Sequence, residues 1–580
     1  MALLVAALCA CSSKEKEPEL AIPPPPTYRG PTFLRGTIAS VAELRGYRDV
    51  LVSGYGVVVG LQGTGSPDCP AAIRGAILDM MRKGGFGQHR LGLGDHTPQA
   101  VLASGQAAVV LVRGVVPAGA PKGTRFDLEV RALDQSSTTS LEGGILYTIP
   151  LTTGEPDPRI TGFNIAEGHG PIFINPFVDP EKPAQDSDDP RRIGSIPAGG
   201  ITKQAMSLEL VTTRPSLRLV QQITERINTR FPPDRTDAGP MATPATESIV
   251  RIRVLDRFRD NPQRMIELIS HLFLDPTPTF AQGKAKELAD LLANAEHRSH
   301  ADTVSVTWEA MGRVILPVIR EYYESPDATL QMAALQAGAG LGDSRTIDPL
   351  KAIATTPGGG RRCEQATVLL GRLLVGRPGN PQIITPLRKL LDHDDPLVRL
   401  AAYEALAAVD DPTIQRFAFA GKMEMAVVRC DKPMIYATRS GPPRLVIFND
   451  RMGFTQPMIF SMWDNRFMLK TTHADPKLNV FYKKPEDRRP NIQSVTATVP
   501  YLTGLLAYQP KTGLVNESPG LGFTYNRIVS ILHRLSERGY IQAKLVMQQD
   551  TLADRIARLR ISDPPPERPE STPQARSSGG

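Results

Sequence analysis

A short run of valines held between glycines is the feature that most restricts the fold of this 580-residue chain. Residues 53–66 read SGYGVVVGLQGTGS, with Val57, Val58 and Val59 adjacent. Such runs are typical of buried β-strands, because β-branched side chains favour extended backbone and glycine permits positive φ or close backbone approach. Neither this segment nor residues 119–151 contains a catalytic group. Both are therefore interpreted as parts of a framework that packs against a partner or against copies of itself.

Composition indicates a large globular protein with an aliphatic core, since hydrophobic residues make up 41% and aromatic residues only 6% of the chain. At about 150 residues per domain, the length predicts about four domains. The net charge of +7 permits contact with anionic surfaces such as peptidoglycan or lipid headgroups. Nucleic acid is not an expected partner, because basic residues do not form blocks interleaved with aromatic residues.

The first residues have the pattern of a lipoprotein signal. Residues 1–11 read MALLVAALCAC, an apolar run shorter than the roughly 20 residues that cross a bilayer. Its end resembles a bacterial lipobox in which Cys11 would be acylated, and Ser12 favours sorting to the outer membrane. The alternative is a disordered apolar N-terminus. Residues 12–33 contain four consecutive prolines and are predicted to form an extended linker.

The next part of the chain is predicted to be β-rich and then mixed. Over residues 34–151 we expect strands at 36–44, 50–61, 99–114, 124–133 and 144–152, with one helix at Ala71–Gly84. Residues 152–200 are rich in Gly, Pro and Asp and are predicted to form an irregular loop. Residues 201–275 alternate strand, helix, strand, helix, with the helices at Ser216–Arg230 and Pro262–Phe273.

Several short motifs follow one another in this N-terminal half. The glycine-rich motif residues are Gly54, Tyr55, Gly56, Gly60, Gly63, Thr64, Gly65, Gly143 and Gly144. Further motif positions are Pro121, Gly123, Arg125 and Asp127, followed by the segments 192–199 and 227–231. In this order they resemble the flagellar P-ring protein family over roughly residues 34–275.

The resemblance implies a structural protein without a cofactor and not an enzyme. It implies self-association into a homo-oligomeric ring around the flagellar rod, in the periplasm and within the peptidoglycan layer. The implied partners are other copies of the chain, flagellar rod and L-ring proteins, and peptidoglycan. The usual C-terminal portion of the family is not recognisable here, and a possible lipid tether is a second departure from the family pattern.

Residues 280–418 change character to an Ala- and Leu-rich sequence with an internal recurrence. The octapeptide LQMAALQA at 330–337 corresponds to VRLAAYEA at 398–405, 68 positions later. Half of 68 is close to the period of helix-pair repeats, and a middle copy can be drawn at Ala366–Val375. Second helices of each copy are predicted at Ile347–Thr355, at Ile383–Asp392 and from Ile414 onward. The pattern resembles HEAT-type repeats that stack into a solenoid; the alternative is an ordinary helical bundle.

Residues 419–560 are predicted to form a C-terminal β-plus-helix domain. It opens with a hairpin-like pair of strands, 433–438 and 444–448, flanking the sequence SGPP. Further strands are expected at 458–462, 467–470, 479–482 and 495–498, and an amphipathic helix at Tyr525–Gly539. Residues 561–580 are rich in Pro, Ser and Glu and are predicted to be disordered.

The sequence contains no convincing catalytic, cofactor or metal motif. The glycines at 60, 63 and 65 do not follow the order of a dinucleotide loop, and no GK[ST] follows a glycine cluster. His297 and His300 lack the i,i+4 spacing of zincin metal sites, so they are interpreted as parts of a solvated helix end. The cysteines Cys69, Cys363 and Cys430 are widely separated and predict no disulfide framework.

The prediction from sequence is therefore an α+β multidomain protein of the bacterial cell envelope. It has a β-rich P-ring-like N-terminal half, an α-helical HEAT-like repeat array and a C-terminal mixed α/β region. We expect a structural component of the flagellar basal body, located in the periplasm and associated with the outer membrane. The alternative function is an envelope lipoprotein adaptor that binds protein partners through its repeats without forming a ring.

Overall fold

The computed structural model of this protein describes most of the chain between residues 28 and 556. The described residues are 28, 30–61, 63–83, 97–156, 164–175, 189–237, 239–259, 261–419, 422–473, 476–483, 490–510, 520–548, 552 and 556. The predicted signal segment with Cys11, most of the linker, and the tail at 561–580 lie outside them.

A closed six-stranded barrel forms the first unit. Its strands are β2 (Val50–Val59), β3 (Ala107–Val116), β4 (Arg125–Ala132), β5 (Ile145–Thr153), β6 (Ala166–Pro171) and β7 (Ile193–Thr202). They close in the order β2-β3-β4-β7-β6-β5, with every neighbouring pair antiparallel. Alternate residues such as Val52 and Val58 point inward into an apolar core, as the period of a strand requires.

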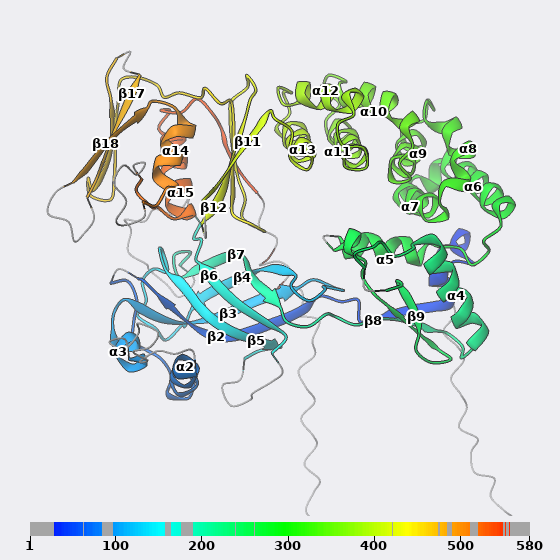
Figure 1. The fold of residues 1–580 in the computed structure, drawn as a ribbon, viewed down its shortest axis with the longest axis horizontal. Coiled ribbons are helices and arrows are strands. Elements are labelled where there is room, and N and C mark those ends of the chain that lie inside the picture. The colour runs from blue at the N-terminus through cyan, green and yellow to red at the C-terminus, as the bar shows by residue number, and fades with distance from the viewer. Residues whose placement is uncertain are drawn as a thin grey trace, which may run out of the picture.

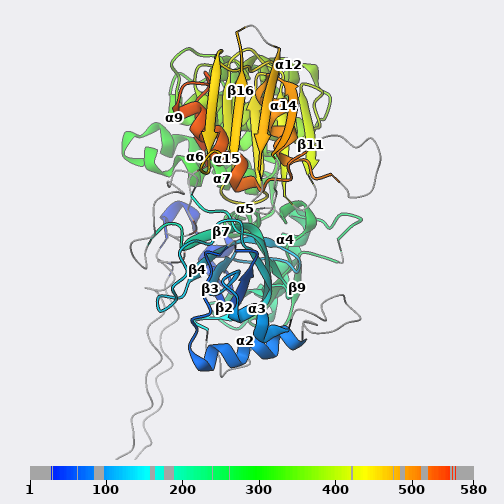
Figure 2. The same ribbon diagram turned by 90° about the vertical axis from the view of Figure 1, so that its left-hand side faces the viewer.

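Two helices cover the outer side of β2 and β3. They are α2 (Ala71–Lys83) and α3 (Pro98–Ala103), which lie below the barrel in Figure 2. Residues Ile73, Ile77 and Met81 of α2 recur every fourth position and are buried against the barrel. The start of α3 is fixed by Thr97, whose hydroxyl accepts a hydrogen bond from the N–H of Ala100.

A second unit is built on a four-stranded antiparallel sheet. The strands β1 (Ala42–Arg45), β8 (Leu208–Thr212), β10 (Ile249–Ile252) and β9 (Ala242–Pro244) lie in that order. The short helix α1 (Ile38–Val41) precedes β1, and the helices α4 (Leu217–Arg230) and α5 (Pro262–Ser270) contribute to the same apolar core. The predicted strand, helix, strand, helix order over 201–275 is confirmed.

Three sequence expectations for this half need correction. The predicted strand 36–44 is a helical turn followed by β1, and the predicted strand 99–114 begins with α3. Residues 152–200 are not simply an irregular loop, because β6 and β7 lie within them and complete the barrel. Glycine and proline are frequent in these two strands, which made their extended character hard to recognise in the sequence.

Helices then continue from residue 278 to residue 407. They are α6 (Pro278–Ala293), α7 (Ala301–Met311), α8 (Leu316–Ile319), α9 (Ala328–Gly340), α10 (Ile347–Ala354), α11 (Arg361–Val375), α12 (Pro381–Leu390) and α13 (Pro396–Ala407). Helices α7, α9, α11 and α13 pack successively side by side, and α10 and α12 pack against this row (Figure 1). Short 3-10 helices lie at Thr32–Leu34, Asp256–Phe258, Ala295–His300, Arg313–Ile315, Arg320–Tyr322 and Ser344–Thr346.

The C-terminal region consists of two sheets with helices between them. One sheet has the order β11 (Ile414–Phe419), β12 (Met423–Val428), β14 (Arg444–Phe448), β13 (Met434–Ala437) and β19 (Leu545–Met547). The other runs through β15 (Met458–Met462), β16 (Phe467–Thr471), β17 (Lys477–Tyr482) and β18 (Asn491–Thr496). Helices α14 (Val499–Ala507) and α15 (Tyr525–Glu537) fill the space between them (Figure 1). The helix expected from Ile414 onward is wrong, because β11 begins there.

The chain returns on itself, so that its two halves lie side by side. The barrel lies below the C-terminal region in Figure 1, and the unit that contains α4 and α5 lies below α7. The residues Leu552 and Ile556 pack against Leu51 and Val115 of the barrel. None of the helices in the described ranges combines the length and the hydropathy needed to cross a membrane.

Candidate functional site

The glycine-rich motif on β2 lines the seam at which the barrel closes. β2 pairs with β5 near both of its ends, with a shift of register between. At this shift a Cβ on Gly54 would lie 2.7 Å from the carbonyl oxygen of Pro150. A Cβ on Gly56 would lie 2.9 Å from the side chain of Leu146. The two glycines therefore allow β5 to approach β2 closely.

The chain leaves β2 through a turn built on further motif glycines. Gly60 and Gly63 have φ values of +82° and +84°, a conformation that favours glycine. The N–H of Gly65 donates a 2.9 Å hydrogen bond to the carbonyl of Gly105. A side chain on Gly65 would overlap the carbonyl of Ala107, so the turn can lie flat against the start of β3 only with glycine at this position.

The loop before β5 is tied to the same turn. The hydroxyl of Thr64 donates a 2.8 Å hydrogen bond to the carbonyl of Ser140. Gly143 has φ of +75°, and a Cβ on Gly144 would lie 2.8 Å from the side chain of Leu61. The structure thus gathers Thr64 and the motif glycines around one seam of the barrel, although they are up to 90 positions apart in the sequence.

The remaining predicted site residues are Tyr55 and Cys11. The side chain of Tyr55 points away from the barrel interior and packs on the apolar cluster beneath α2 and α3. Cys11 lies outside the described residues. The family-motif glycines are framework positions by geometry, since they permit close packing and carry no reactive group.

Asp127 of β4 connects the barrel to the C-terminal region. Its Oδ1 accepts hydrogen bonds from the N–H of Ala198 at 2.7 Å and from the N–H of Gly441 at 2.9 Å. Ala198 has φ of +53°, which is unusual for a residue with a side chain, and it lies where the β4–β7 register shifts. One carboxylate therefore supports a bulge of the barrel and holds the turn between β13 and β14.

Aromatic contacts extend this junction. The rings of Phe173, from the barrel side, and Tyr525 of α15 have centroids 5.4 Å apart. Phe173 is buried in the apolar core of the C-terminal region, so the two units share a core residue. Near the motif loop, burial raises the pKa of Glu142, and the positive charge of Arg527 partly opposes that shift. The Arg527 guanidinium also lies 5.4 Å from the ring centre of Trp463.

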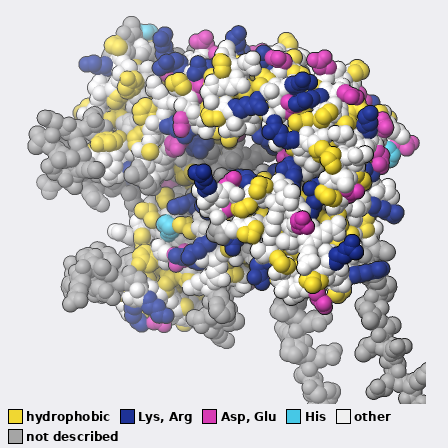
Figure 3. Space-filling view, turned by 45° about the vertical axis from the view of Figure 1, so that its right-hand side comes forward, with side chains coloured by type: hydrophobic (Ala, Val, Ile, Leu, Met, Phe, Trp, Pro, Cys, Tyr) yellow, Lys and Arg dark blue, Asp and Glu magenta, His cyan; other side chains and the backbone are white. Residues whose placement is uncertain are grey.

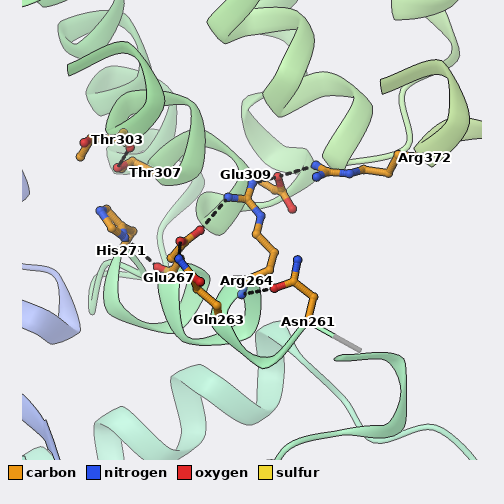
Figure 4. Close-up of polar contacts among 9 residues, drawn as sticks. All are labelled: Asn261, Gln263, Arg264, Glu267, His271, Thr303, Thr307, Glu309 and Arg372. Carbon is orange, nitrogen blue, oxygen red and sulfur yellow. Dashed lines mark hydrogen bonds and ion pairs between the residues drawn. The ribbon is translucent and has the colours of Figure 1, made fainter. Parts of the chain in front are cut away.

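A buried carboxylate joins the sheet unit to the helical array (Figure 4). Glu309 of α7 has a side chain only 9% exposed, and it forms an ion pair with Arg264 of α5. Arg372 of α11 approaches the same carboxylate at 3.7 Å. Arg264 also contacts the more exposed Glu267, at 3.2 Å. A carboxylate that receives two guanidinium groups from separate helices fixes the positions of those helices relative to one another.

The end of α7 receives a further arginine. Arg230, the last residue of α4, donates hydrogen bonds to the carbonyls of Glu309 at 2.7 Å and Ala310 at 2.9 Å. Both carbonyls lie in the last turn of α7, where a cation is favourable, and that of Glu309 also accepts a 3.2 Å hydrogen bond from the N–H of Gly312. Burial lowers the pKa of Arg230, and the charge of Glu309 opposes this shift.

Within the helical array the same ion pair occurs twice. Arg320 donates from Nε and Nη2 to Asp343 at 2.8 and 3.0 Å. Arg388 makes the equivalent pair of bonds to Asp411 at 3.1 and 2.9 Å. Each residue of the second pair lies 68 positions after its counterpart, the period noted in the sequence. In the middle copy, Arg377 lies 34 positions after Asp343 and therefore takes the place of the aspartate, and its side chain donates to the carbonyl of Gly342 at 2.9 Å.

Among the residues that the structure describes, no three His, Cys, Asp or Glu side chains form a group suited to a metal ion. His297 and His300 stack with ring centroids 6.1 Å apart, and His300 packs edge-on against Phe33. On the face shown in Figure 3, basic, acidic and hydrophobic side chains are interspersed.

Part of the chain is similar to proteins of known family. Residues 37–282 match the sequence profile of the family described as "Flagellar P-ring protein". The flagellar P-ring protein of Oleidesulfovibrio alaskensis is 28% identical over 242 residues, which cover 41% of this chain and 60% of that protein. The protein of the same name from Rhodospirillum rubrum is 25% identical over 248 residues, covering 41% and 59%. The match thus spans about three-fifths of the length of these relatives, and the helical array after residue 282 and the C-terminal region lie outside it.

Proposed function

We propose that this protein is a structural component of the bacterial flagellar basal body, resembling the P-ring subunit. The observation that carries the proposal is the match of residues 37–282 to that family. The geometry is compatible with it, since the motif glycines allow the strands at the barrel seam to pack closely. The proposed assembly is a ring of identical copies around the flagellar rod, closed by repeated heterologous interfaces.

The proposed surroundings follow from that assembly. The ring would lie in the periplasm within the peptidoglycan layer, next to rod and L-ring proteins, and would act mechanically without a cofactor. The interspersed charges of Figure 3 are compatible with protein contacts of this kind.

The helical array is proposed to be a short HEAT-like solenoid attached to this framework. The repeated Arg–Asp pair, 68 positions apart, and the successive packing of α7, α9, α11 and α13 support this interpretation. A solenoid presents an extended surface for protein partners. In a ring, the array would extend the framework and contact neighbouring envelope components.

A lipid tether on Cys11 is proposed for the N-terminus. Metabolic labelling with an alkyne-tagged fatty acid tests it in a bacterium that expresses the full chain. We expect the label to be lost in Cys11→Ser and kept in the matched Cys9→Ser variant. Label retained in Cys11→Ser would contradict the assignment.

Electron microscopy of the purified full chain tests ring formation. The protein would carry Cys11→Ser to keep it free of lipid, and it would be examined by negative stain with and without purified rod protein. We expect closed rings of uniform diameter in at least the sample with rod. Gly75→Ala, on the exposed side of α2, is the control variant that should form the same rings.

A ring-free adaptor is the second candidate function. It is favoured by the fact that more than half of the chain lies outside the family match. Monodisperse monomers in both samples, together with recovery of envelope proteins through the helical array, would favour the adaptor over the ring.

A further inference from the structure

The outer face of the sheet that contains β15, β16, β17 and β18 carries exposed apolar side chains. This sheet lies at the left-hand end of the molecule in Figure 1 and comes to the front in Figure 2. Ile459 on the edge strand β15 is 63% exposed, and Ile492 on the opposite edge strand β18 is 60% exposed. Among the large apolar side chains of the described residues, only that of Tyr501 is more exposed.

The pairing register extends these two residues into an apolar strip. Met468, Phe481 and Ile492 are direct cross-strand neighbours on β16, β17 and β18. Because neighbouring strands lie about 4.8 Å apart, these three residues span about 10 Å. Ile459 lies one strand further, in the adjacent row. The alternate residues of the same strands, such as Phe460 and Leu469, form the core with α14 and α15, but none of the four strip residues belongs to an apolar core of the described structure.

Basic side chains lie beside this strip. Lys470 pairs directly with Ile459 on the outer face. Arg466 precedes Met468 by two positions and Lys483 follows Phe481 by two positions, and residues two apart along a strand share a face. All three basic side chains are exposed. Asp464, in the turn between β15 and β16, is the one acidic residue among the described residues of this sheet and its turns.

The charge of the whole C-terminal region has the same sign. Residues 419–560 contain 21 Lys and Arg residues and 11 Asp and Glu residues, a net charge of +10, although the complete chain carries only +7. The excess positive charge of the protein is therefore concentrated in the region that contains the strip. A surface of this sign attracts a partner with negative charge.

An apolar strip with cations beside it fits the surface of an anionic membrane. The aliphatic part of a lysine side chain can lie along apolar groups while its ammonium group reaches lipid phosphates. Isoleucine side chains leave water when they enter the boundary between headgroups and acyl chains. Glycan strands of peptidoglycan would leave them in a polar environment. A face-to-face contact with a second copy would bring the lysines of one copy against those of the other.

We propose that the outer face of the sheet from β15 to β18 binds the surface of a membrane that contains anionic lipids. The apolar strip enters the headgroup boundary, and Arg466, Lys470 and Lys483 contact lipid phosphates. The contact lies outside the part of the chain that matches the P-ring family. It depends neither on ring formation nor on a lipid at Cys11.

Co-sedimentation with vesicles tests this contact in the full-length chain carrying Cys11→Ser. Vesicles of phosphatidylglycerol and phosphatidylcholine are compared with vesicles of phosphatidylcholine alone, and we expect tight binding only to the former. Lys470→Gln combined with Lys483→Gln should weaken that binding more than about tenfold, since each lysine near an anionic membrane contributes about fivefold. The matched control is Lys286→Gln combined with Lys389→Gln, at exposed lysines of α6 and α12, which should change the affinity less than about twofold.

Tryptophan quenching by lipids with brominated acyl chains locates the contact on the chain. In a background with Trp463→Phe, a tryptophan replaces Ile492 or, as the matched control, Ile145, which is 52% exposed on the barrel strand β5. Trp308 is fully buried and contributes the same background to both proteins. We expect the brominated vesicles to quench Ile492→Trp at least about threefold more than Ile145→Trp. All variants should keep the circular dichroism spectrum of the parent chain.

Four results would overturn the proposal. Equal binding to the two kinds of vesicle, or equal losses in the two lysine pairs, would show that the cations of this face do not hold a membrane. Equal quenching at positions 492 and 145 would place the membrane contact elsewhere on the chain. Absence of vesicle binding by the chain with an unaltered sheet would favour an acidic protein as the partner of this face.

Discussion

Gly54 and Gly75 form a matched pair for testing the role of the motif glycines. A Cβ on Gly54 would press on the Pro150 carbonyl, whereas a Cβ on Gly75 meets nothing within 4 Å. We expect Gly54→Ala to destabilise the barrel by about 1–3 kcal/mol, because backbone must move to admit the methyl group. Gly75→Ala should stabilise α2 by about 0.5–1 kcal/mol. Hydrogen exchange of β2 and β5 peptides measures the difference, and equal protection in the two variants would contradict the packing account.

Glu309 and Glu267 allow a second comparison, because both contact Arg264. Glu309 is buried, and its replacement removes the carboxylate that Arg264 and Arg372 share, which leaves Arg264 with only the more exposed Glu267. We expect Glu309→Gln to lower the free energy of unfolding by about 3 kcal/mol. Glu267→Gln, at a side chain 37% exposed, should cost less than about 1 kcal/mol.

The neighbouring Trp308 reports on this junction, since its side chain is fully buried in α7. Urea unfolding followed by its fluorescence, in a background with Trp463→Phe, gives both free energies. Similar losses in the two glutamate variants would show that the buried carboxylate does not hold the junction.

The motif residues, Asp127 among them, could be recognised in the sequence, but the contacts that form the junctions could not. The glycines of 54–65 were recognisable because they surround a valine run, and the structure adds that they form the closing seam of the barrel. Glu309 and its partner Arg264 are 45 positions apart, and Asp127 and Gly441 are 314 positions apart. Contacts between residues so far apart in the sequence depend on how the folded units pack against one another, and no local sequence pattern indicates them.

The two aspartates of the repeated ion pairs, Asp343 and Asp411, are buried and should contribute to the stability of the helical array. Burial alone would raise the pKa of Asp343, but hydrogen bonds from Arg320, from the N–H of Arg345 and from Tyr323 lower it below 3.8. Asp411 is shifted in the same direction, because Arg388 and Thr413 outweigh its burial.

The free energy of unfolding of the array should therefore decrease at low pH. A carboxyl whose pKa is lower in the folded chain binds protons preferentially in the unfolded chain. The stabilisation is complete above about pH 4 and is lost as the pH falls through the folded-state pKa. We expect the helical circular dichroism of the double variant Asp343→Asn, Asp411→Asn to melt at a lower temperature than wild type at pH 7. The difference should shrink toward pH 3.

An exposed aspartate provides the control for this titration. Asp348 is 87% exposed and pairs with Lys351 on one helix, so Asp348→Asn should leave the melting temperature almost unchanged at both pH values. A pH-independent difference between wild type and the double variant would contradict the role of the two ionised carboxyls.

Element types could be predicted where periodicity was clear. Helices α9 to α12 and strands β13 to β17 lie close to their predicted ranges. The strand expected at 99–114 is wrong in its first residues, because Thr97 and Pro98 begin a helix there. The helix expected from Ile414 is wrong because the repeat pattern was continued past its last copy. Residues Ile414–Phe419 form β11, which pairs with β12.

At the scale of the whole molecule, the contact between the barrel and the C-terminal region holds the two units together. Phe173 is 4% exposed within the core of that region, so a charge at this position cannot be buried there. We expect Phe173→Asp to separate the two units and increase the radius of gyration in small-angle X-ray scattering. Ile145→Asp, at a residue of the barrel that is 52% exposed, should leave it unchanged. An unchanged radius of gyration in Phe173→Asp would contradict the importance of this contact.

Overall architecture was only partly accessible to sequence reasoning. A β-rich first half, a helical middle and a β-containing end follow from local patterns. The closure of the barrel depends on β6 and β7, whose glycines and prolines conceal their strand character. The return of the C-terminal region onto the barrel depends on single residues such as Asp127 and Phe173.

The central claim is that this chain is a P-ring-like component of the flagellar basal body. The most direct measurement is electron cryotomography of flagellar motors in the organism that carries the gene, comparing wild type with a strain in which the gene is deleted. The account predicts that the periplasmic ring density around the rod is lost on deletion and restored by the wild-type chain. Motors with an unchanged ring in the deletion strain would contradict the claim.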